Sequence, residues 1–331
     1  MNRIDLLSKW SEAMPVLDKG FLRIVDVMGD DAAICQMART SYGAGTKTIS
    51  DDTTLIRYLI RHLHTSPLEG CVVKFHVKMP MDCARQWIRH RTMSLIEPSQ
   101  CEYDEFSLNE VSTRYSIVTE DIAETSADGW RLQSKDNKQG SSGLVVEWPE
   151  GYEAYIHSED GRAGSPDYPV PGQEASGTPG LYLSLKEKDF HRTARKLYEE
   201  RLQFGVAREQ ARKDLPLSQY TEFYVVGNAW NVFHFLRLRL DSHAQLEIRS
   251  YAEVLARFCA DWLPVAWKAF SDYAIEAKTF SYQELELIRG LLSGKYDKDW
   301  NVLSSQLSEL GLTKREFQEF RAKIGEATLL S

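Results

Sequence analysis

The chain has 331 residues, of which 43% are apolar and 11% aromatic, so it exceeds one typical domain and can bury a sizeable core. Its formal net charge of −8 argues against a nucleic-acid-binding surface, and no apolar run approaches the roughly 18 residues that cross a bilayer. The N-terminus, Met1-Asn2-Arg3-Ile4-Asp5, has no signal-peptide apolar segment, so we expect a cytoplasmic protein with neither nucleic-acid nor membrane partners.

Two strands and two helices are predicted before residue 80. Residues 21–28 and 71–78 alternate as strands do, and residues 30–40 and 53–64 have helical patterns. In the second helix the apolar side chains recur at helical spacing: Leu55, Ile56, Leu59, Ile60 and Leu63.

A third helix is predicted to begin at Pro80-Met81-Asp82, since Pro suits the first turn, and to run to His90. One side of it would be apolar and carry Ala84, Trp87 and Ile88. The opposite side would direct three polar groups out of the core: Gln86, Arg89 and His90.

The rest of the chain is mainly helical in pattern. Residues 183–204 and 222–240 predict helices, and Ser242-x-x-Gln245 is a capping-box pattern for a helix that runs to about Trp262. Residues 134–180 are rich in Gly, Ser, Pro, Asp and Glu, which predicts a long, partly disordered surface segment. Two clear helical patterns follow in the tail, at 282–292 and 313–324. No GxGxxG or Walker loop occurs, so no Rossmann or P-loop site is predicted.

The cysteines indicate neither a disulfide framework nor a zinc site. Their number is odd and no two of them form a C-x-x-C pair. The sequence therefore predicts reduced thiols without a role in covalent catalysis: Cys35, Cys71, Cys83, Cys101 and Cys259.

Cations and polar groups are concentrated between Arg89 and Tyr115. Arg89-His90-Arg91 is followed by Asn109-Glu110-Val111-Ser112-Thr113-Arg114-Tyr115. In a strand, Glu110, Ser112 and Arg114 would project from one face. A guanidinium can donate two parallel hydrogen bonds to a phosphate, and His changes protonation near neutrality, so this segment predicts an anion site.

These two motifs resemble the signature of the flavin-dependent thymidylate synthases, in which Arg-His-Arg precedes Asn-Glu-x-Ser-x-Arg-Tyr. Further blocks resemble that family and occur in its order between about residues 20 and 275. They are Arg39-Thr40-Ser41, His64-Thr65-Ser66-Pro67-Leu68-Glu69, Phe75-His76-Val77-Lys78, Ala84-Arg85-Gln86-Trp87, Ala211-Arg212 with Leu215-Pro216, Tyr220-Thr221-Glu222-Phe223, and Leu238-Arg239-Leu240-Asp241-Ser242-His243-Ala244-Gln245.

The sequence departs from the family pattern in three places. Thr92 to Leu108 separate the two halves of the signature, where the family has a much shorter spacer, so the family serine of this gap is Ser94 or Ser107. We expect Ser107, with the insertion looping away from the phosphate site. A second insertion spans about 125–182, and Trp230 stands where the family has an Arg that contacts the flavin.

The resemblance implies an α+β fold with an antiparallel sheet flanked by helices, and a homotetramer with active sites shared between chains. Residues 1–278 would form the catalytic domain, with insertions at about 93–107 and 125–182, and residues 279–331 a helical C-terminal extension. The implied reaction is reductive methylation: dUMP receives a one-carbon unit from methylenetetrahydrofolate by way of FAD, and NADPH re-reduces the flavin. The products are dTMP and tetrahydrofolate.

The resemblance also assigns roles to individual residues. Arg239 would be catalytic, because a cation beside the uracil ring favours its ionised form. The dUMP-binding residues would be Gln86, Arg89, Glu110, Ser112, Arg114, Arg212 and Arg239. The FAD-binding residues would be Ser41, His64, Ser66, Arg89, His90, Arg91, Thr92, Glu110, Asn228, His234 and His243.

Several alternatives accompany these assignments. The arginines of the signature could be ordinary surface ion-pair partners, and Arg237, two positions from Arg239, lies on a different helix side and is expected to be solvated. The pairs His243 with Glu247 and His62 with His64 could be metal ligands, but neither has a third ligand at suitable spacing, so no metal is predicted. The rival functions are a flavin- or nucleotide-binding protein without methyl transfer, and a nucleic-acid-binding module.

Overall fold

The computed structural model describes residues 2–40, 51–90, 108–110, 121–135, 140–150, 178–297, 299–305, 307 and 309–325. The chain divides into two compact units, Met1–Ala269 and Phe270–Ser331. This division falls earlier than the boundary at 278–279 expected from the sequence, so the π-helical turn η4 (Ser271–Ile275) belongs to the second unit. How far the catalytic domain extends in function stays a prediction.

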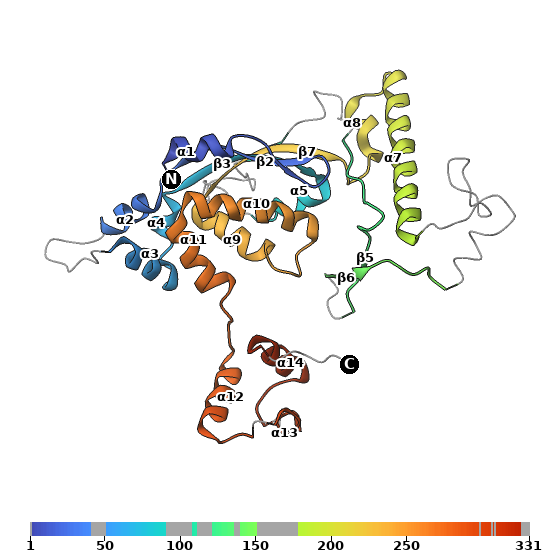
Figure 1. The fold of residues 1–331 in the computed structure, drawn as a ribbon. Coiled ribbons are helices and arrows are strands. Elements are labelled where there is room, and N and C mark those ends of the chain that lie inside the picture. The colour runs from blue at the N-terminus through green and yellow to red at the C-terminus, as the bar shows by residue number, and fades with distance from the viewer. Residues whose placement is uncertain are drawn as a thin grey trace. The chain divides into compact units, whose positions relative to one another are not determined.

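A five-stranded antiparallel sheet forms the centre of the first unit (Figure 1). Its strand order is β1 (Met14–Val16), β2 (Gly20–Met28), β3 (Val72–Pro80), β7 (Tyr220–Asn228) and β4 (Leu108–Glu110). Alternate side chains of β3 are fully buried, which gives the sheet one wholly apolar face: Val73, Phe75, Val77 and Met79. The predicted α+β class with an antiparallel sheet is confirmed.

Strand β7 lies in a segment for which the sequence pattern predicted a helix, so the first part of the 222–240 prediction was wrong. Its residues are largely aromatic or β-branched, and they pair with β3 in an unbroken register from Val72↔Asn228 to Pro80↔Tyr220. Pairing with a buried central strand therefore overrode the helical pattern. The helix begins only at Ala229, where Asn228 Oδ1 accepts a hydrogen bond from the backbone N–H of Asn231 at 2.9 Å.

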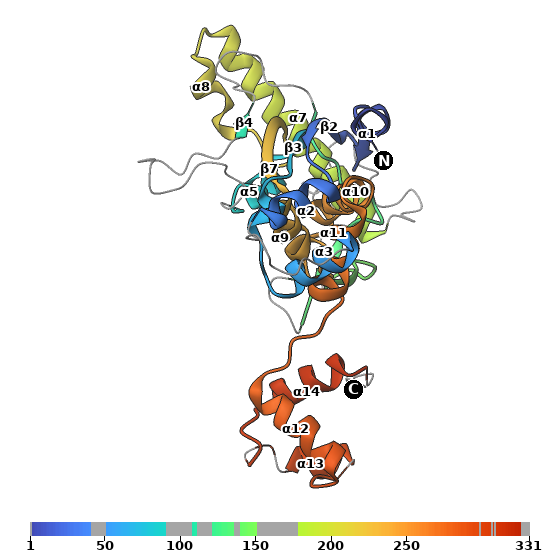
Figure 2. The same cartoon turned by 90° about the vertical axis from the view of Figure 1, so that its left-hand side faces the viewer.

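Three helices cover the apolar face of the sheet: α5 (Met81–Trp87), α9 (Ala229–Arg239) and α10 (Leu246–Trp262) (Figures 1 and 2). Tyr251 of α10 donates a hydrogen bond to the backbone oxygen of Lys78 at 2.6 Å, which ties this helix to β3. Helix α11 (Pro264–Phe270) follows α10 along the chain. The sheet and these helices position the residues of the candidate site.

Helix α5 is shorter than predicted, because it ends at Trp87 and not at His90. Ala84 and Trp87 are buried as expected, while Ile88 caps the helix and is half-buried. The helical spacing does not extend to His90, and that side chain is buried, not directed out of the core.

The remaining N-terminal helices are α1 (Arg3–Trp10), α2 (Asp31–Arg39), α3 (Asp52–Arg61) and α4 (Ser66–Glu69). Helix α1 packs against β2, α2 packs against α3 and α4, and α4 packs against α9. The first four predicted apolar positions of α3 are buried, but Leu63 is 69% exposed. Leu63 lies beyond the helix end with a positive φ of 57°, which turns the chain away from the helical path and takes this side chain out of the core.

The second insertion contains more regular structure than the composition predicted. Strands β5 (Arg131–Gln133) and β6 (Ser141–Leu144) form a separate two-stranded sheet. All four residues of β6 are exposed, so residues 141–144 are an ordered part of the predicted surface segment. Residues 151–177 lie outside the described part. Helix α7 (Pro179–Gln203) then packs against α8 (Arg208–Ala211) and the 3₁₀ turn η3 (Arg212–Asp214).

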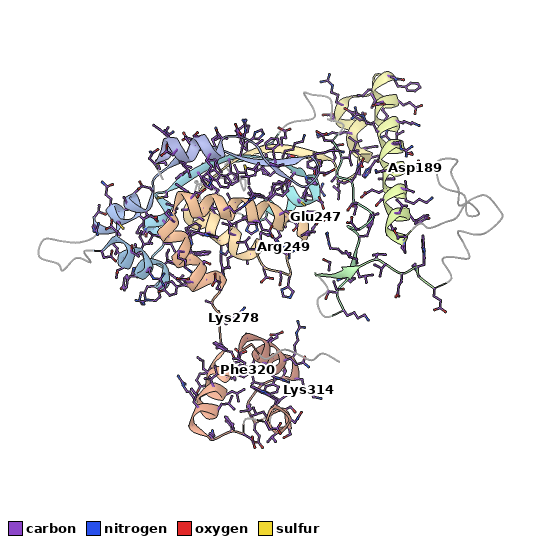
Figure 3. All side chains as sticks on the ribbon, viewed as in Figure 1. Asp189, Glu247, Arg249, Lys278, Lys314 and Phe320 are labelled. Atoms are coloured by element: carbon purple, nitrogen blue, oxygen red, sulfur yellow. The ribbon has the colours of Figure 1, made fainter. Side chains whose placement is uncertain are left out.

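The second unit is a small helical assembly of α12 (Tyr282–Ser293), α13 (Trp300–Ser305) and α14 (Lys314–Lys323). The two helices predicted in the tail are confirmed as α12 and α14. They have an apolar core of their own around Leu287, Leu303, Phe317 and Phe320, the last labelled in Figure 3.

Candidate functional site

The centre of the candidate site is a contact between α9 and the residues just after α5. Arg239 donates from Nε to His90 Nε2 at 2.9 Å. His90 is buried and packs edge-on against Phe235, with ring centroids 4.8 Å apart. Two residues that the sequence singled out separately are therefore in contact within a single chain.

His90 is neutral in this arrangement. Burial, followed by the nearby charges of Arg239 and His234, lowers the pKa of His90 to about 4. A neutral ring can accept at Nε2 only if Nδ1 carries the proton, so the contact with Arg239 also sets the tautomer. The positive charge of the pair therefore belongs to the guanidinium alone.

Arg239 is half-buried, and burial lowers its pKa from the usual value. None of the carboxylates in the described ranges forms an ion pair with it. Arg237, two residues earlier, is exposed, in line with the expected difference between the two helix sides. A partly desolvated cation without a protein carboxylate is suited to an anionic or strongly polar ligand.

A chain of amide groups continues the site along α5. Gln86 Nε2 donates to Gln245 Oε1, and Gln245 Nε2 donates to Asp82 Oδ2 at 3.3 Å. Gln245 also stands at the N-cap of α10, which has no side-chain cap, so the predicted Ser242-x-x-Gln245 capping box was wrong. The Gln245 side chain is directed to α5 instead. This contact of Gln245 was not predicted from the sequence, although Gln245 is the last residue of one of the family blocks quoted above.

Two other predicted flavin contacts lie at the start of α9 and on it. Asn228 is 8% exposed and caps the helix, while His234 is exposed on its surface. Trp230, at the position of the family Arg, is half-buried in the first turn of the same helix.

Other predicted site residues lie on separate elements. Glu110 is exposed at the edge strand β4 and accepts a hydrogen bond from Thr221 at 2.6 Å. Arg212 is half-buried in η3, and Arg89 is exposed after α5. Glu110 and Arg212 therefore belong to parts of the fold different from the contact between His90 and Arg239, whereas Arg89 directly precedes His90.

The predicted residues His64, Ser66 and His243 are exposed. The His64 ring packs edge-on against Tyr58, with centroids 5.7 Å apart. His243 bonds Asp241 at 2.7 Å through Nδ1 and does not join Glu247 in a metal pair. Glu247, labelled in Figure 3, instead accepts hydrogen bonds at 2.6 and 2.9 Å from Arg131 of β5.

The remaining predicted residues lie outside the described part: Ser41, Arg91, Thr92, Ser112 and Arg114. The same holds for the insertion up to Ser107, and so for the choice between Ser94 and Ser107. In the part that is described, no group of three His, Cys, Asp or Glu side chains could hold a metal, and no helix is long and apolar enough to cross a membrane.

A second polar network, on the other face of the sheet, was not predicted as a unit. Arg23 Nε donates to His76 Nδ1 at 3.1 Å, and His76 Nε2 lies 3.2 Å from Glu222 Oε2. The His76 ring also stacks on Tyr224 at 4.3 Å, and burial, followed by the charge of Arg23, lowers the pKa of His76. The alternation of Phe75-His76-Val77-Lys78 places His76 on this face, but only the pairing of β2, β3 and β7 reveals its partners.

Comparison with known families gives one match over most of the chain. The family model described as "Thymidylate synthase complementing protein" matches residues 23–265. A flavin-dependent thymidylate synthase of Thermus thermophilus is 43% identical over 317 residues, which cover 95% of this chain and 97% of that protein. One of Ruegeria pomeroyi is 40% identical over 313 residues, covering 95% and 88%.

Among solved structures, the chain is similar to a UMP/dUMP methylase, PolB from Streptomyces cacaoi, bound to 5-Br UMP. The TM-score is 0.57 at 27% sequence identity, and the match covers 79% of this chain and 98% of the other. The same methylase bound to 5-Br dUMP gives a TM-score of 0.58 at 25% identity.

Proposed function

We propose how this chain, which belongs to the flavin-dependent thymidylate synthase family, carries out its reaction. The chain is a methyltransferase that converts dUMP to dTMP with a flavin, a folate one-carbon donor and a reductant. The flavin is FAD, and the folate is methylenetetrahydrofolate. NADPH as the reductant, the residue roles and the assembly are proposals.

One observation carries the residue assignment: Arg239 is a half-buried cation that His90 orients and that no described carboxylate neutralises. Beside a uracil ring, its guanidinium donates hydrogen bonds that favour the ionised base over the neutral one. Ionisation raises the electron density at the ring carbon that receives the one-carbon unit. Arg239 is therefore the catalytic residue of this proposal.

His90 acts as a positioning residue for that guanidinium. Its neutral ring accepts from Arg239 Nε without adding a second positive charge, so the terminal nitrogens of Arg239 stay directed to the base. Packing against Phe235 fixes the ring in turn. The hydrogen bond to His90 and the packing of His90 against Phe235 together hold the Arg239 guanidinium in place, as a preorganised catalytic group requires.

The remaining substrate contacts follow from residue chemistry. The arginines Arg89, Arg114 and Arg212 would bind mainly the dUMP phosphate, since a guanidinium fork matches its oxygens. Gln86, Glu110 and Ser112 would orient the base and sugar. Ser112 is a positioning hydroxyl in this proposal and not a nucleophile.

The residues present also fit a flavin. Asn228 and His90 are buried polar groups next to α9, and His234 adds an exposed one on the same helix. They would hold FAD together with Arg89, Glu110 and the residues Ser41, His64, Ser66, Arg91, Thr92 and His243. When bound, the flavin supplies hydride and relays the one-carbon unit.

A homotetramer with shared active sites belongs to the same proposal. Its support is that the candidate residues lie on different elements of the fold: Glu110 on an edge strand, His64 and Ser66 after α3, and His243 before α10. Copies of the chain could supply these groups to one another. The proposed location is the cytoplasm, and light scattering of the purified protein tests the assembly.

The function is tested by omission. Purified protein should form dTMP from dUMP only when methylenetetrahydrofolate, FAD and a reduced nicotinamide are all present, and it should show a flavin absorption spectrum. Parallel reactions with NADPH and NADH decide the reductant. Turnover by flavin-free protein would contradict the proposal, and a yellow protein that binds dUMP without forming dTMP would support the binding-protein alternative.

A further inference from the structure

A cavity of about 510 Å³ lies beside α7, on elements other than α5 and α9. Its wall is formed by one side of α7, by Lys19 between β1 and β2, and by Ile122 and Glu124 of the segment that leads from β4 toward β5. Figure 3 marks α7 by Asp189. The volume is within the range of small-molecule sites, which is roughly 300–1,000 Å³.

The lining of this cavity is strongly basic although the chain as a whole carries a net charge of −8. Glu124 is the single acidic residue of the lining. The cations come from two elements and converge on the same space: Lys19, Lys188, Arg192, Arg195 and Lys196.

Part of this charge is held in place by neighbouring groups. Lys19 Nζ donates to the backbone oxygen of Ile122 at 2.8 Å, and Lys188 lies 3.2 Å from Glu124. Arg195 Nε donates to Glu199 at 2.7 Å. Asp18 lies 3.9 Å from Lys19, and the charge of Glu187 acts on His191. The five cations of the lining therefore stand against four neighbouring carboxylates, Asp18, Glu124, Glu187 and Glu199, and Arg192 and Lys196 are at exposed positions.

An incompletely bonded buried histidine belongs to the same lining. His191 is 8% exposed, and its Nε2 lies 3.1 Å from the Ser218 hydroxyl. Its Nδ1 is buried and has no hydrogen-bonding partner among the described residues. A buried ring nitrogen rarely lacks a hydrogen-bonding partner, because each missing bond lowers the free energy of unfolding by about 1–3 kcal/mol. If the Ser218 hydroxyl donates to Nε2, then Nδ1–H is a donor for a ligand oxygen.

We propose that this cavity is a second ligand site, which binds a small molecule carrying a di- or triphosphate group. The lysines and arginines neutralise the phosphate charges, and His191 supplies a directional hydrogen bond from the buried side. The net acidity of the chain and the limited volume favour a small ligand over a nucleic acid. The inference does not depend on the residue roles proposed for the methyl transfer.

Titration calorimetry of the flavin-loaded protein at saturating dUMP tests the proposal, with inorganic tripolyphosphate and dTTP, the triphosphate of the reaction product, as probes. Saturating dUMP keeps the nucleotide site of the reaction filled. Binding should weaken at least about 10-fold in Arg192→Glu/Lys196→Glu, because attraction becomes repulsion within a few ångströms. His191→Phe, which keeps the ring volume, should weaken binding about 5- to 10-fold by removing one hydrogen bond to a charged group.

The matched control is Lys314→Glu/Arg315→Glu on the exposed surface of α14, which changes the net charge by the same amount on a helix of the second unit. It should bind the probes as the unchanged protein does. All variants should retain flavin and dTMP formation, which verifies folding, and Arg192→Ala/Lys196→Ala replaces the charge reversal if that variant misfolds.

Tighter binding of dTTP than of tripolyphosphate would assign a nucleotide to the cavity, and equal binding would assign the phosphate chain alone. Both results support the site. Equal affinity of the unchanged protein and the α7 variants, an equal loss in the α14 control, or the absence of binding by either probe would overturn it.

Discussion

The second unit and the junction between α9 and α10 both contain the capping-box sequence pattern, but only the second unit forms capping boxes. In the second unit, Ser281 with Glu284 and Thr313 with Glu316 form complete capping boxes at the starts of α12 and α14. At the junction, Ser242 and Gln245 have the same spacing but form no box.

The difference lies in the competing partners. Gln245 contacts Gln86 and Asp82 of α5, so its amide is engaged in a tertiary contact. The caps of α12 and α14 are formed by side chains within one turn of each helix, where the local capping hydrogen bonds prevail over other contacts. Polar groups at the junction should therefore affect the chemistry, whereas those of the second unit should affect stability.

The largest effect is expected for Arg239→Ala. Loss of the donor proposed for the uracil ring should lower the turnover number on the order of 100-fold or more, with flavin content and thermal stability nearly unchanged. Steady-state dTMP formation measures it. Arg237→Ala, on the exposed side of α9, is the control and should be much milder. Equal effects of the two substitutions would disprove the assignment.

In the second unit, Lys323→Met should destabilise α12 and α14 by about 2 kcal/mol, since it leaves the buried Glu284 carboxylate without its cation. Hydrogen exchange of the α12 and α14 amides in the full-length chain measures this. Arg289→Met, which removes an exposed partner of Glu286, is the control and should cost little.

The same pair predicts a pH dependence. Burial acts to raise the pKa of Glu284, but hydrogen bonds from Lys323 and from the Ser281 backbone outweigh it, and the pKa is lowered. A lowered carboxyl pKa contributes stability that is present above the unfolded pKa of about 4.3 and is lost as the pH falls through the folded value. The protection factors of the α12 amides, which are corrected for the intrinsic pH dependence of exchange, should therefore fall below about pH 4.3. An equally steep change in Lys323→Met would contradict this origin.

A smaller effect on turnover is expected for His90→Phe, on the order of 10-fold, because Arg239 loses the acceptor that orients it. His90→Gln, which can still accept a hydrogen bond, should recover part of the rate. The comparison uses the turnover number and the KM for dUMP at equal flavin content. If His90 only fills space, Phe should match or exceed Gln.

Removal of the caps in the second unit should cost about 1 kcal/mol each for Ser281→Ala and Thr313→Ala, with dTMP formation unchanged. Amide exchange of α12 and α14 is again the measurement. A loss of activity in either variant would show that the second unit contributes to the reaction.

The smallest effect is expected for Ser242→Ala, within about 0.5 kcal/mol, because this serine does not cap α10. Thermal unfolding of the full-length chain, in parallel with Ser281→Ala, makes the comparison direct. A cost as large as that of Ser281→Ala would indicate that the box at the junction does form.

Local sequence was sufficient where neighbouring residues along the chain decide the structure. The helices at 282–292 and 313–324, the strand of β3 and the buried stripe of α3 all follow from spacing and caps, and the ordered motifs identified the family. The motifs also singled out His90 and Arg239, although not their contact.

Tertiary structure decided what depends on partners distant in sequence. Residues 220–228 became a strand because β3 offers a complete register of backbone hydrogen bonds, which outweighs a helical pattern. His90 turned inward because α5 ends at Trp87, and its pKa fell because α9 buries it beside Arg239. The basic cavity needed α7 to be placed next to Lys19 and Ile122, residues that lie far from α7 along the chain. Burial and long-range pairing are properties of the assembled fold, and a linear pattern does not contain them.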